Sequence, residues 1–148
     1  MTMGLYRGHD IESELEAMLT ALVPTLRSGG FVKDQAVAVV VMDPKDESTE
    51  WFDLKFGEPA VKYLVNASKK AKMVARTGRD SSEFSGADRA LLDQGDFPWA
   101  GGVKRHGIIV GVSGWSQGQD QFLAELVASY IFLKMGDAID DWKDSPSK

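Results

Sequence analysis

Apolar residues recur at three- and four-residue intervals near the start of the chain, a spacing that predicts an amphipathic helix beginning at Asp10. Asp10 is a suitable N-cap, and acidic residues in the first turn suit the positive end of the helix dipole. We expect Pro24 to kink or end this helix, and Gly29 and Gly30 to stop it in any case. The apolar face consists of Ile11, Leu15, Met18, Leu19, Leu22 and Leu26.

The next two segments have the patterns of β-strands. Residues 35–42 are almost entirely apolar and rich in valine, which predicts a short strand buried on both faces. Residues 51–56 alternate instead, with their apolar residues on one face. The segment Asp43-Pro44-Lys45-Asp46 lies between them and consists of turn-forming residues, so the two strands are predicted to pair as a hairpin.

A second helix is predicted from Ala60 to Arg79, with Pro59 at an early position. Its charged residues are all basic, because no acidic residue occurs from Val61 to Arg79. The apolar stripe of this helix consists of Ala60, Leu64, Ala67, Ala71, Val74 and Ala75. A separate basic stripe consists of Lys62, Lys69, Lys72, Arg76 and Arg79.

The remaining chain predicts a short helix at 87–92, a turn over Lys104-Arg105-His106-Gly107 and a strand over 108–112 that ends at Ser113 and Gly114. A final helix begins near Gln119, and its apolar arc is wider than one core contact needs. A second apolar row on this helix indicates a surface for another subunit. This row consists of Ile131, Met135, Ile139 and Trp142.

Length and composition place these elements in one domain. The chain has 148 residues, of which 43% are hydrophobic and 26% charged, as in soluble globular proteins. The order of elements contains no βαβ series, so we predict one α/β (α+β) domain over residues 1–148 with a mainly antiparallel sheet. Residues 1–9 are predicted to form a flexible arm, and residues 137–148 an acidic tail.

The sequence gives no indication of a signal peptide or a membrane span. The first residues lack a basic segment followed by a long apolar run. The longest apolar run, residues 36–42, is far shorter than the roughly 20 residues that a membrane span requires. We therefore expect a cytoplasmic protein with no membrane partner.

Charge and residue types exclude several functions. The chain has 17 Lys and Arg against 22 Asp and Glu, and its net charge of -5 argues against nucleic acid as a partner. With no cysteine and only two histidines, His9 and His106, a dedicated zinc site is not expected. The acidic residues concentrate in the first helix and the tail, so the basic second helix still permits a local site for a small anion.

Three segments are candidate sites. The basic stripe leads into Thr77-Gly78-Arg79-Asp80-Ser81-Ser82, where cations and hydroxyls could hold carboxylates or phosphates, although an ordinary solvated helix face gives the same pattern. Gly111-Val112-Ser113-Gly114-Trp115 is similar to the nucleophile elbow of serine hydrolases, but Trp115 stands where that motif needs glycine. We therefore reject a serine hydrolase. Two interpretations of this turn remain, namely a site for an anion or a simple change of chain direction. His106 is either a ligand or an exposed turn residue.

Several blocks together resemble the GlcG/HbpS-like superfamily, whose members are often called haem-binding or haem-degrading, and in particular its poorly characterised cytosolic branch. The resemblance covers roughly residues 36–132. The blocks are Ser68-Lys69-Lys70-Ala71-Lys72, Thr77-Gly78-Arg79, Ser81-Ser82, Phe97-Pro98, the run from Gly107 to Gly114, and Gln119-Asp120. This chain departs from the family pattern at Gln121, where relatives often have a histidine, and at Trp99, which is more usually aliphatic.

The resemblance implies a profilin-like, three-layer α-β-α fold and assembly into dimers, rings or stacks. It also implies a site for haem or another tetrapyrrole in some members. The residues that match family motifs are Lys70, Arg79, Ser81, Ser82, Phe97, Gly107, Ser113, Gly114 and Asp120.

We expect an oligomeric cytosolic protein that binds a small ligand, with haem or a related tetrapyrrole as the named candidate. Its propionates would pair with Arg76 and Arg79, and Phe97 or Trp99 would supply an apolar wall. The iron would be bound by His106, a tyrosine, a methionine or no protein ligand. The alternative is a structural or protein-interaction module whose function is its assembly. The sequence shows no convincing catalytic constellation, so an enzyme of unknown reaction is the third hypothesis.

Overall fold

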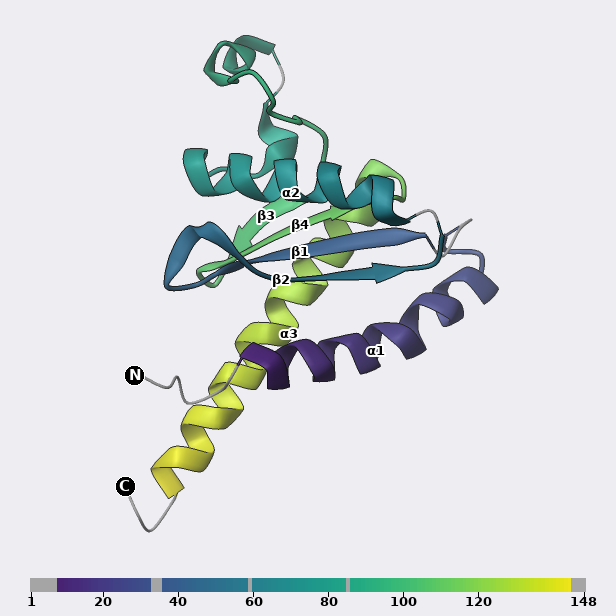
Figure 1. Ribbon diagram of the computed structural model, residues 1–148, viewed down its shortest axis with the longest axis vertical. Helices are drawn as coiled ribbons and strands as arrows, with labels where there is room; N and C mark the ends of the chain where they lie inside the picture. Colours follow the sequence, from purple (N-terminus) through teal and green to yellow (C-terminus); the bar gives the residue numbers. More distant parts are fainter. Residues whose placement is uncertain (1–7, 33–35, 59, 85, 145–148) are drawn as a thin grey trace.

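A computed structural model describes residues 8–32, 36–58, 60–84 and 86–144 (Figure 1). The side chains of His9, Ile139 and Trp142 lie outside what it describes. The helices are α1 (Gly8–Ser28), α2 (Ala60–Thr77) and α3 (Gln117–Asp144), with short 3-10 helices at Ser81–Glu83 and Gly86–Leu91. The strands are β1 (Val37–Asp43), β2 (Asp46–Phe56), β3 (Gly102–Arg105) and β4 (Ile108–Ser113).

The four strands form one antiparallel sheet in the order β2-β1-β4-β3. Helix α2 covers one face of this sheet, while α1 and α3 lie on the other, so the molecule has three layers (Figure 1). The predicted hairpin is confirmed as β1 and β2, which pair from Val37 with Phe56 to Asp43 with Asp46. The prediction of a three-layer domain with an antiparallel central sheet is confirmed.

Strand β1 is apolar at nearly every position because both of its faces are buried. Val37, Val39 and Val41 belong to the larger core with α1 and α3, and the intervening residues belong to the smaller core with α2. A strand with solvent on one face would alternate, whereas a strand between two helical layers has no polar face. The prediction that this strand is buried on both faces is confirmed.

Helix α1 does not end at Pro24, as one of our two expectations had it, but continues to Ser28. Proline cannot donate the helical hydrogen bond to the carbonyl of Thr20. Both Pro24 and Thr20 are exposed, so water can replace the missing donor. The helix stops just before the two glycines, Gly29 and Gly30.

Two further elements differ from the sequence prediction. Lys104 and Arg105, which we expected in a turn, belong to the short strand β3, and only His106 and Gly107 form the turn to β4. Helix α3 continues through Gly136 to Asp144, so most of the predicted acidic tail is helical. Of the helices in the described ranges, none has the length and apolar composition needed to cross a membrane.

Helix α2 packs closely on the sheet at Gly111 of β4. A Cβ atom at this position would lie 2.1 Å from the carbonyl oxygen of Ala67 and 3.0 Å from the backbone nitrogen of Ala71. The helix presents alanines here, so its backbone, not a flexible side chain, meets the strand. Any side chain at position 111 must therefore displace α2 from the sheet.

We expect Gly111→Ala to lower the free energy of unfolding by about 1–3 kcal/mol, the usual effect of overpacking a rigid contact. The matched control is Gly118→Ala in the first turn of α3, where a Cβ would meet nothing within 4 Å. Alanine is the better helix former, so this control should be neutral or slightly stabilising. Urea unfolding followed by circular dichroism measures both, and equal stability of the two variants would contradict the packing argument.

Candidate functional site

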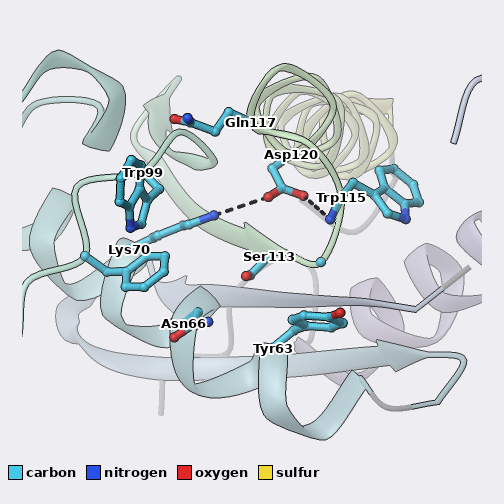
Figure 2. Close-up of a pocket in the computed structure, with 10 residues that line it drawn as sticks. Tyr63, Asn66, Lys70, Trp99, Ser113, Trp115, Gln117 and Asp120 are labelled. Carbon is cyan, nitrogen blue, oxygen red and sulfur yellow. Dashed lines mark hydrogen bonds and ion pairs between the residues drawn. The ribbon is translucent and has the colours of Figure 1, made fainter. Parts of the chain in front are cut away.

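An open pocket of about 460 Å³ lies where residues 63–70 of α2, the end of β4 and the first turn of α3 meet (Figure 2). Its volume is within the range of about 300–1,000 Å³ that small-molecule sites usually have. Ten residues from four parts of the chain line the pocket. They are Tyr63, Asn66 and Lys70 of α2, Phe97 and Trp99 before β3, Ser113 at the end of β4 with Gly114 and Trp115 after it, and Gln117 and Asp120 of α3.

Lys70 and Asp120 form a buried ion pair in this pocket. Their exposed fractions are only 2% and 3%, and Lys70 Nζ lies 3.3 Å from Asp120 Oδ2. Lys70 Nζ also donates a hydrogen bond of 2.8 Å to the carbonyl oxygen of Val112. The other carboxylate oxygen, Asp120 Oδ1, accepts a 2.9 Å hydrogen bond from the backbone N–H of Trp115. Both ends of the pair are therefore held in place by the backbone, and Figure 2 shows the ion pair and the hydrogen bond from Trp115.

Burial shifts the acid–base equilibrium of both partners toward their neutral forms. Burial lowers the pKa of Lys70, and the nearby charge of Asp120 offsets this only in part. Burial also raises the pKa of Asp120 to about 6, against the opposing effects of Lys70 and the N–H groups of Trp115 and Gly114. Burial therefore brings the pKa of the amine and the pKa of the carboxyl group closer together.

Phe97 and Trp99 form an aromatic wall beside Lys70. Their ring centroids are 6.2 Å apart in an edge-on arrangement, and Lys70 Nζ lies 5.6 Å from the centroid of Phe97. The carbonyl of Trp99 accepts a 2.6 Å hydrogen bond from Ser81 Oγ, and the next residue, Ala100, donates its N–H to Gln117 Oε1 at 3.1 Å. These hydrogen bonds connect the backbone of the wall to the 3-10 helix Ser81–Glu83 and to α3. Trp99 itself is 49% exposed.

Gly101 allows the chain to pass directly over the ion pair. Its φ is +121°, and an added Cβ would lie 2.4 Å from the carbonyl oxygen of Val112 and 3.0 Å from Lys70 Nζ. Both the backbone conformation and the space at this position therefore require glycine.

The structure brings six of the predicted site residues into the pocket: Lys70, Phe97, Trp99, Ser113, Gly114 and Asp120. It does not bring the two arginines of the basic stripe there. Arg76 pairs with Asp93 and Asp96, and Arg79 pairs with Asp88 and Glu83. These acids follow α2 in the sequence and neutralise the two arginines at and just beyond its C-terminal end.

The other predicted residues also lie away from the pocket lining. Ser81 is buried and binds the backbone of Trp99 and Gly102, so it supports the aromatic wall from behind. Ser82 is exposed on the short helix that follows α2. His106 is exposed in the β3–β4 turn, where its ring stacks on Phe132 at a centroid distance of 4.2 Å.

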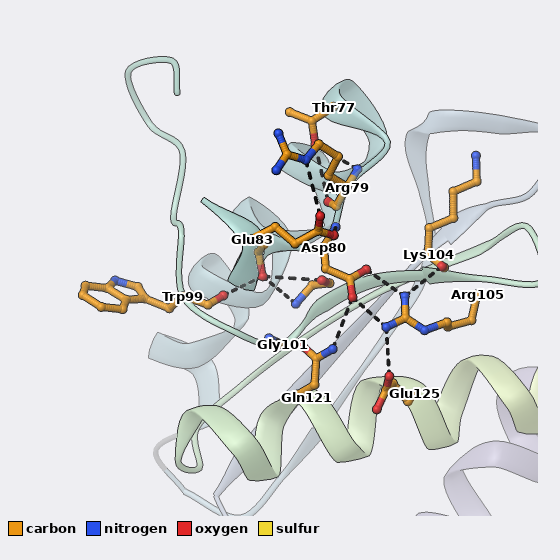
Figure 3. A network of polar contacts seen from close by, with 12 residues as sticks. Thr77, Arg79, Asp80, Glu83, Trp99, Gly101, Lys104, Arg105, Gln121 and Glu125 are labelled. Atoms are coloured by element: carbon orange, nitrogen blue, oxygen red, sulfur yellow. Dashed lines mark hydrogen bonds and ion pairs between the residues drawn. The ribbon is translucent and has the colours of Figure 1, made fainter. Parts of the chain in front are cut away.

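Gln121, at the position where relatives often have a histidine, belongs to a polar network on the other side of the Gly101 loop (Figure 3). Its Nε2 donates to Asp80 Oδ2 at 3.3 Å, and its Oε1 accepts the N–H of Gly101 at 3.4 Å. Arg105 binds both oxygens of Asp80 at 2.7 and 2.6 Å and also Glu125 at 2.8 Å. Burial alone would raise the pKa of Asp80, but the hydrogen bonds and charge of Arg105 bring it below its usual value.

Sequence reasoning missed three lining residues, Tyr63, Asn66 and Gln117, whereas Trp115 ends one of the candidate segments. A signal for two of them is present in α2, because Tyr63 and Asn66 precede Lys70 by seven and four residues and share its face. Lys70 itself stands three residues after Ala67 and four before Val74, on the apolar stripe and not on the basic one. A charged residue in an apolar stripe is the pattern that indicates a buried, paired group.

The fold and pocket define a class of protein, namely a three-layer α/β domain with a ligand-sized pocket beside its sheet. Solved structures share this fold. ORFY of Klebsiella pneumoniae, described by the family model DUF336, is 20% identical with a TM-score of 0.59, covering 81% of this chain and 88% of that chain. The heme complex of PduOC is 22% identical with a TM-score of 0.57, covering 76% and 88%. The Ybr137w protein is 16% identical with a TM-score of 0.59, covering 90% and 80%.

No protein-family model and no curated protein matches the sequence. These solved structures show a shared fold, and that fold agrees with the one that the resemblance to the GlcG/HbpS-like superfamily implies.

The raised pKa of Asp120 predicts a defined dependence of stability on pH. Between the ordinary carboxyl pKa of 3.8 and the folded-state pKa of about 6, the folded chain holds a proton that the unfolded chain has lost. Increasing the pH through this range therefore removes stability. Relative to Asp120→Asn, the wild type should lose on the order of 1–3 kcal/mol between pH 4 and pH 7. Urea unfolding at several pH values measures the difference, and a constant difference would refute the prediction.

Proposed function

We propose that this protein binds a small, flat, anionic ligand in the pocket of Figure 2, with haem or a related tetrapyrrole as the named candidate. The observation that supports the proposal is a buried amine, Lys70, beside the aromatic wall of Phe97 and Trp99 in an open pocket. Flat rings pack on aromatic side chains, and an ammonium group donates charge-assisted hydrogen bonds to carboxylates. The fold shared with the heme complex of PduOC adds independent support.

Asp120 controls how well the pocket accepts an anion. Its carboxylate lies 3.3 Å from Lys70 Nζ and competes with an incoming carboxylate for the amine. Burial raises the pKa of Asp120 to about 6, and an anion nearby raises this pKa further by repulsion. Binding therefore takes up a proton, and we expect higher affinity at pH 6 than at pH 8.

The residues present fit a flat macrocycle but not a histidine-ligated iron. None of the described residues that line the pocket is a histidine, methionine or cysteine. His106 is stacked on Phe132, and Gln121 is bound to Asp80 and Gly101. Tyr63 is the lining residue whose side chain belongs to the usual haem ligands. We therefore propose that the ring and its acidic groups, and not a histidine–iron bond, determine affinity.

Parallel titrations with haemin and metal-free protoporphyrin IX test this proposal. Both should give a saturable change in Soret absorbance at one ligand per chain, with affinities within about tenfold of each other, a difference of about 1.4 kcal/mol. No saturable change with either compound at micromolar protein would contradict it.

Two variants locate the bound ring. Trp99→Ala removes one of the two rings of the aromatic wall and should lower the affinity for both porphyrins by about tenfold. His106→Asn is the control, because it removes an imidazole outside the pocket with a residue that tolerates the φ of +55° found there. Loss of haemin binding in His106→Asn, with protoporphyrin binding retained, would place the haem elsewhere.

Exposed apolar residues on α3 favour a second candidate function, self-assembly as a structural or protein-interaction module. Phe132 and Leu133 are 50% and 57% exposed, and Phe132 is held by its stack on His106. Large apolar side chains that are adjacent and exposed often mark a contact with another chain. The predicted row is wrong at Ile131, which is buried in the core, and Met135 packs against that core. We therefore propose that Phe132 and Leu133 form a contact between copies.

Native mass spectrometry of the full chain should then show more than one subunit, and Leu133→Glu should shift the population toward the monomer. Val61→Glu is the matched control, since it places the same charge on an exposed apolar site on α2, where the exposed fraction is 69%. A wild-type monomer at every concentration tested, or the same shift in both variants, would argue against α3 as the contact.

A further inference from the structure

Lys70 is a buried amine whose position is not explained by stability alone. A buried ion pair adds little net stability, because desolvation of the two charges offsets most of their attraction. Apolar residues at positions 70 and 120 would pack in the interior with no charge to remove from water. The pair instead lies in a pocket, where Lys70 and Asp120 are both lining residues. A role in the chemistry of a ligand accounts for both the burial and the location.

We propose that Lys70 is a nucleophilic amine that condenses reversibly with the carbonyl group of a small aromatic aldehyde or ketone bound in the pocket. The inference rests on the proposed function, because it assigns a ligand chemistry to the same pocket. Lys70 Nζ attacks the carbonyl carbon, and a carbinolamine forms after a proton moves from nitrogen to oxygen. Loss of the hydroxyl group as water then leaves a C=N bond to Lys70, so one carbonyl compound and one amine give one imine and one water.

Asp120 is placed to move the protons of this reaction. Its Oδ2 lies 3.3 Å from Lys70 Nζ, while its Oδ1 is held by the N–H of Trp115. The carboxylate can therefore accept the proton that the amine loses and return it to the departing hydroxyl group. Burial raises the pKa of Asp120 to about 6, which keeps both its protonation states accessible near neutral pH.

The amine itself is prepared for attack. An amine must be neutral to act as a nucleophile, and burial lowers the pKa of Lys70. The carbonyl of Val112 holds Nζ at 2.8 Å, which fixes the reacting atom. The neighbouring Lys69 and Lys72 are exposed, and they lack this environment.

The walls of the pocket favour an aromatic carbonyl compound over an aliphatic one. Phe97 faces Lys70 Nζ, and the rings of Tyr63 and Trp99 also line the pocket. A ring stacked on these side chains would bring a carbonyl substituent to the amine.

The test is reductive trapping on the full-length protein with 4-hydroxybenzaldehyde and sodium cyanoborohydride at pH 7. We expect a single adduct, heavier than the chain by one aldehyde less one oxygen atom, which peptide mapping assigns to Lys70. Lys70→Met should abolish this adduct, and the matched control Lys69→Met should retain it. Asp120→Asn should slow trapping by about 100-fold, within the usual effect of removing a proton-transfer group.

Labelling spread over the exposed lysines, without preference for Lys70, overturns the inference, and so does an undiminished adduct in Lys70→Met. The peptide map of the wild type decides the outcome even if Lys70→Met does not fold. Titration with 4-hydroxybenzyl alcohol, which has the same ring but no carbonyl, separates the two proposals. Binding of the alcohol without trapping of the aldehyde overturns the nucleophile and leaves the ligand-binding function in place. The porphyrin titrations test that function independently.

Discussion

The ion pair between Lys70 and Asp120 connects all three layers of the protein. Lys70 comes from α2 on one face of the sheet, Asp120 from α3 on the other, and the carbonyl of Val112 from β4 between them. Because both partners are buried, loss of either one leaves an uncompensated charge, which in proteins costs about 3–5 kcal/mol. The loop through Gly101 passes so close to the pair that the aromatic wall is positioned by it as well. The shape of the pocket therefore depends on this contact, together with the hydrogen bonds that Ser81 and Gln117 make to the aromatic wall.

Most of the fold could be predicted from the sequence because its elements bury regular patterns. The apolar run of β1 and the stripes of α1 and α2 are local signals, and each gave the correct element. Strand β3 was missed because it has only four residues, two of them the charged Lys104 and Arg105. Its pairing with β4, from Gly102 with Gly111 to Arg105 with Ile108, defines it as a strand. Pro24 was also misleading, because the hydrogen bond that it cannot donate lies on an exposed part of the helix, where water replaces it at little cost in stability.

The candidate site was less predictable, because it depends on residues far apart in the sequence. Lys70 and Asp120 are 50 residues apart, and the sequence pattern around either residue does not show that the other is its partner. The basic stripe suggested Arg76 and Arg79 as ligands of an anion, but charge alone does not show that the chain supplies its own acids from residues 83–96. The resemblance to a family selected Lys70, Phe97 and Asp120 without giving their geometry. Only the packed structure shows the pair and the wall together.

The sheet order leaves β2 at one edge, and the composition of this strand affects how copies of the protein can meet. An edge strand presents unpaired backbone groups to which another strand can add, and this is a common route to aggregation. The strand carries four acidic residues, Asp46, Glu47, Glu50 and Asp53. With Lys55 as its one basic residue, the strand carries an excess of negative charge, and two copies of it would repel each other. The hairpin thus protects its own edge and directs any association of copies toward other surfaces.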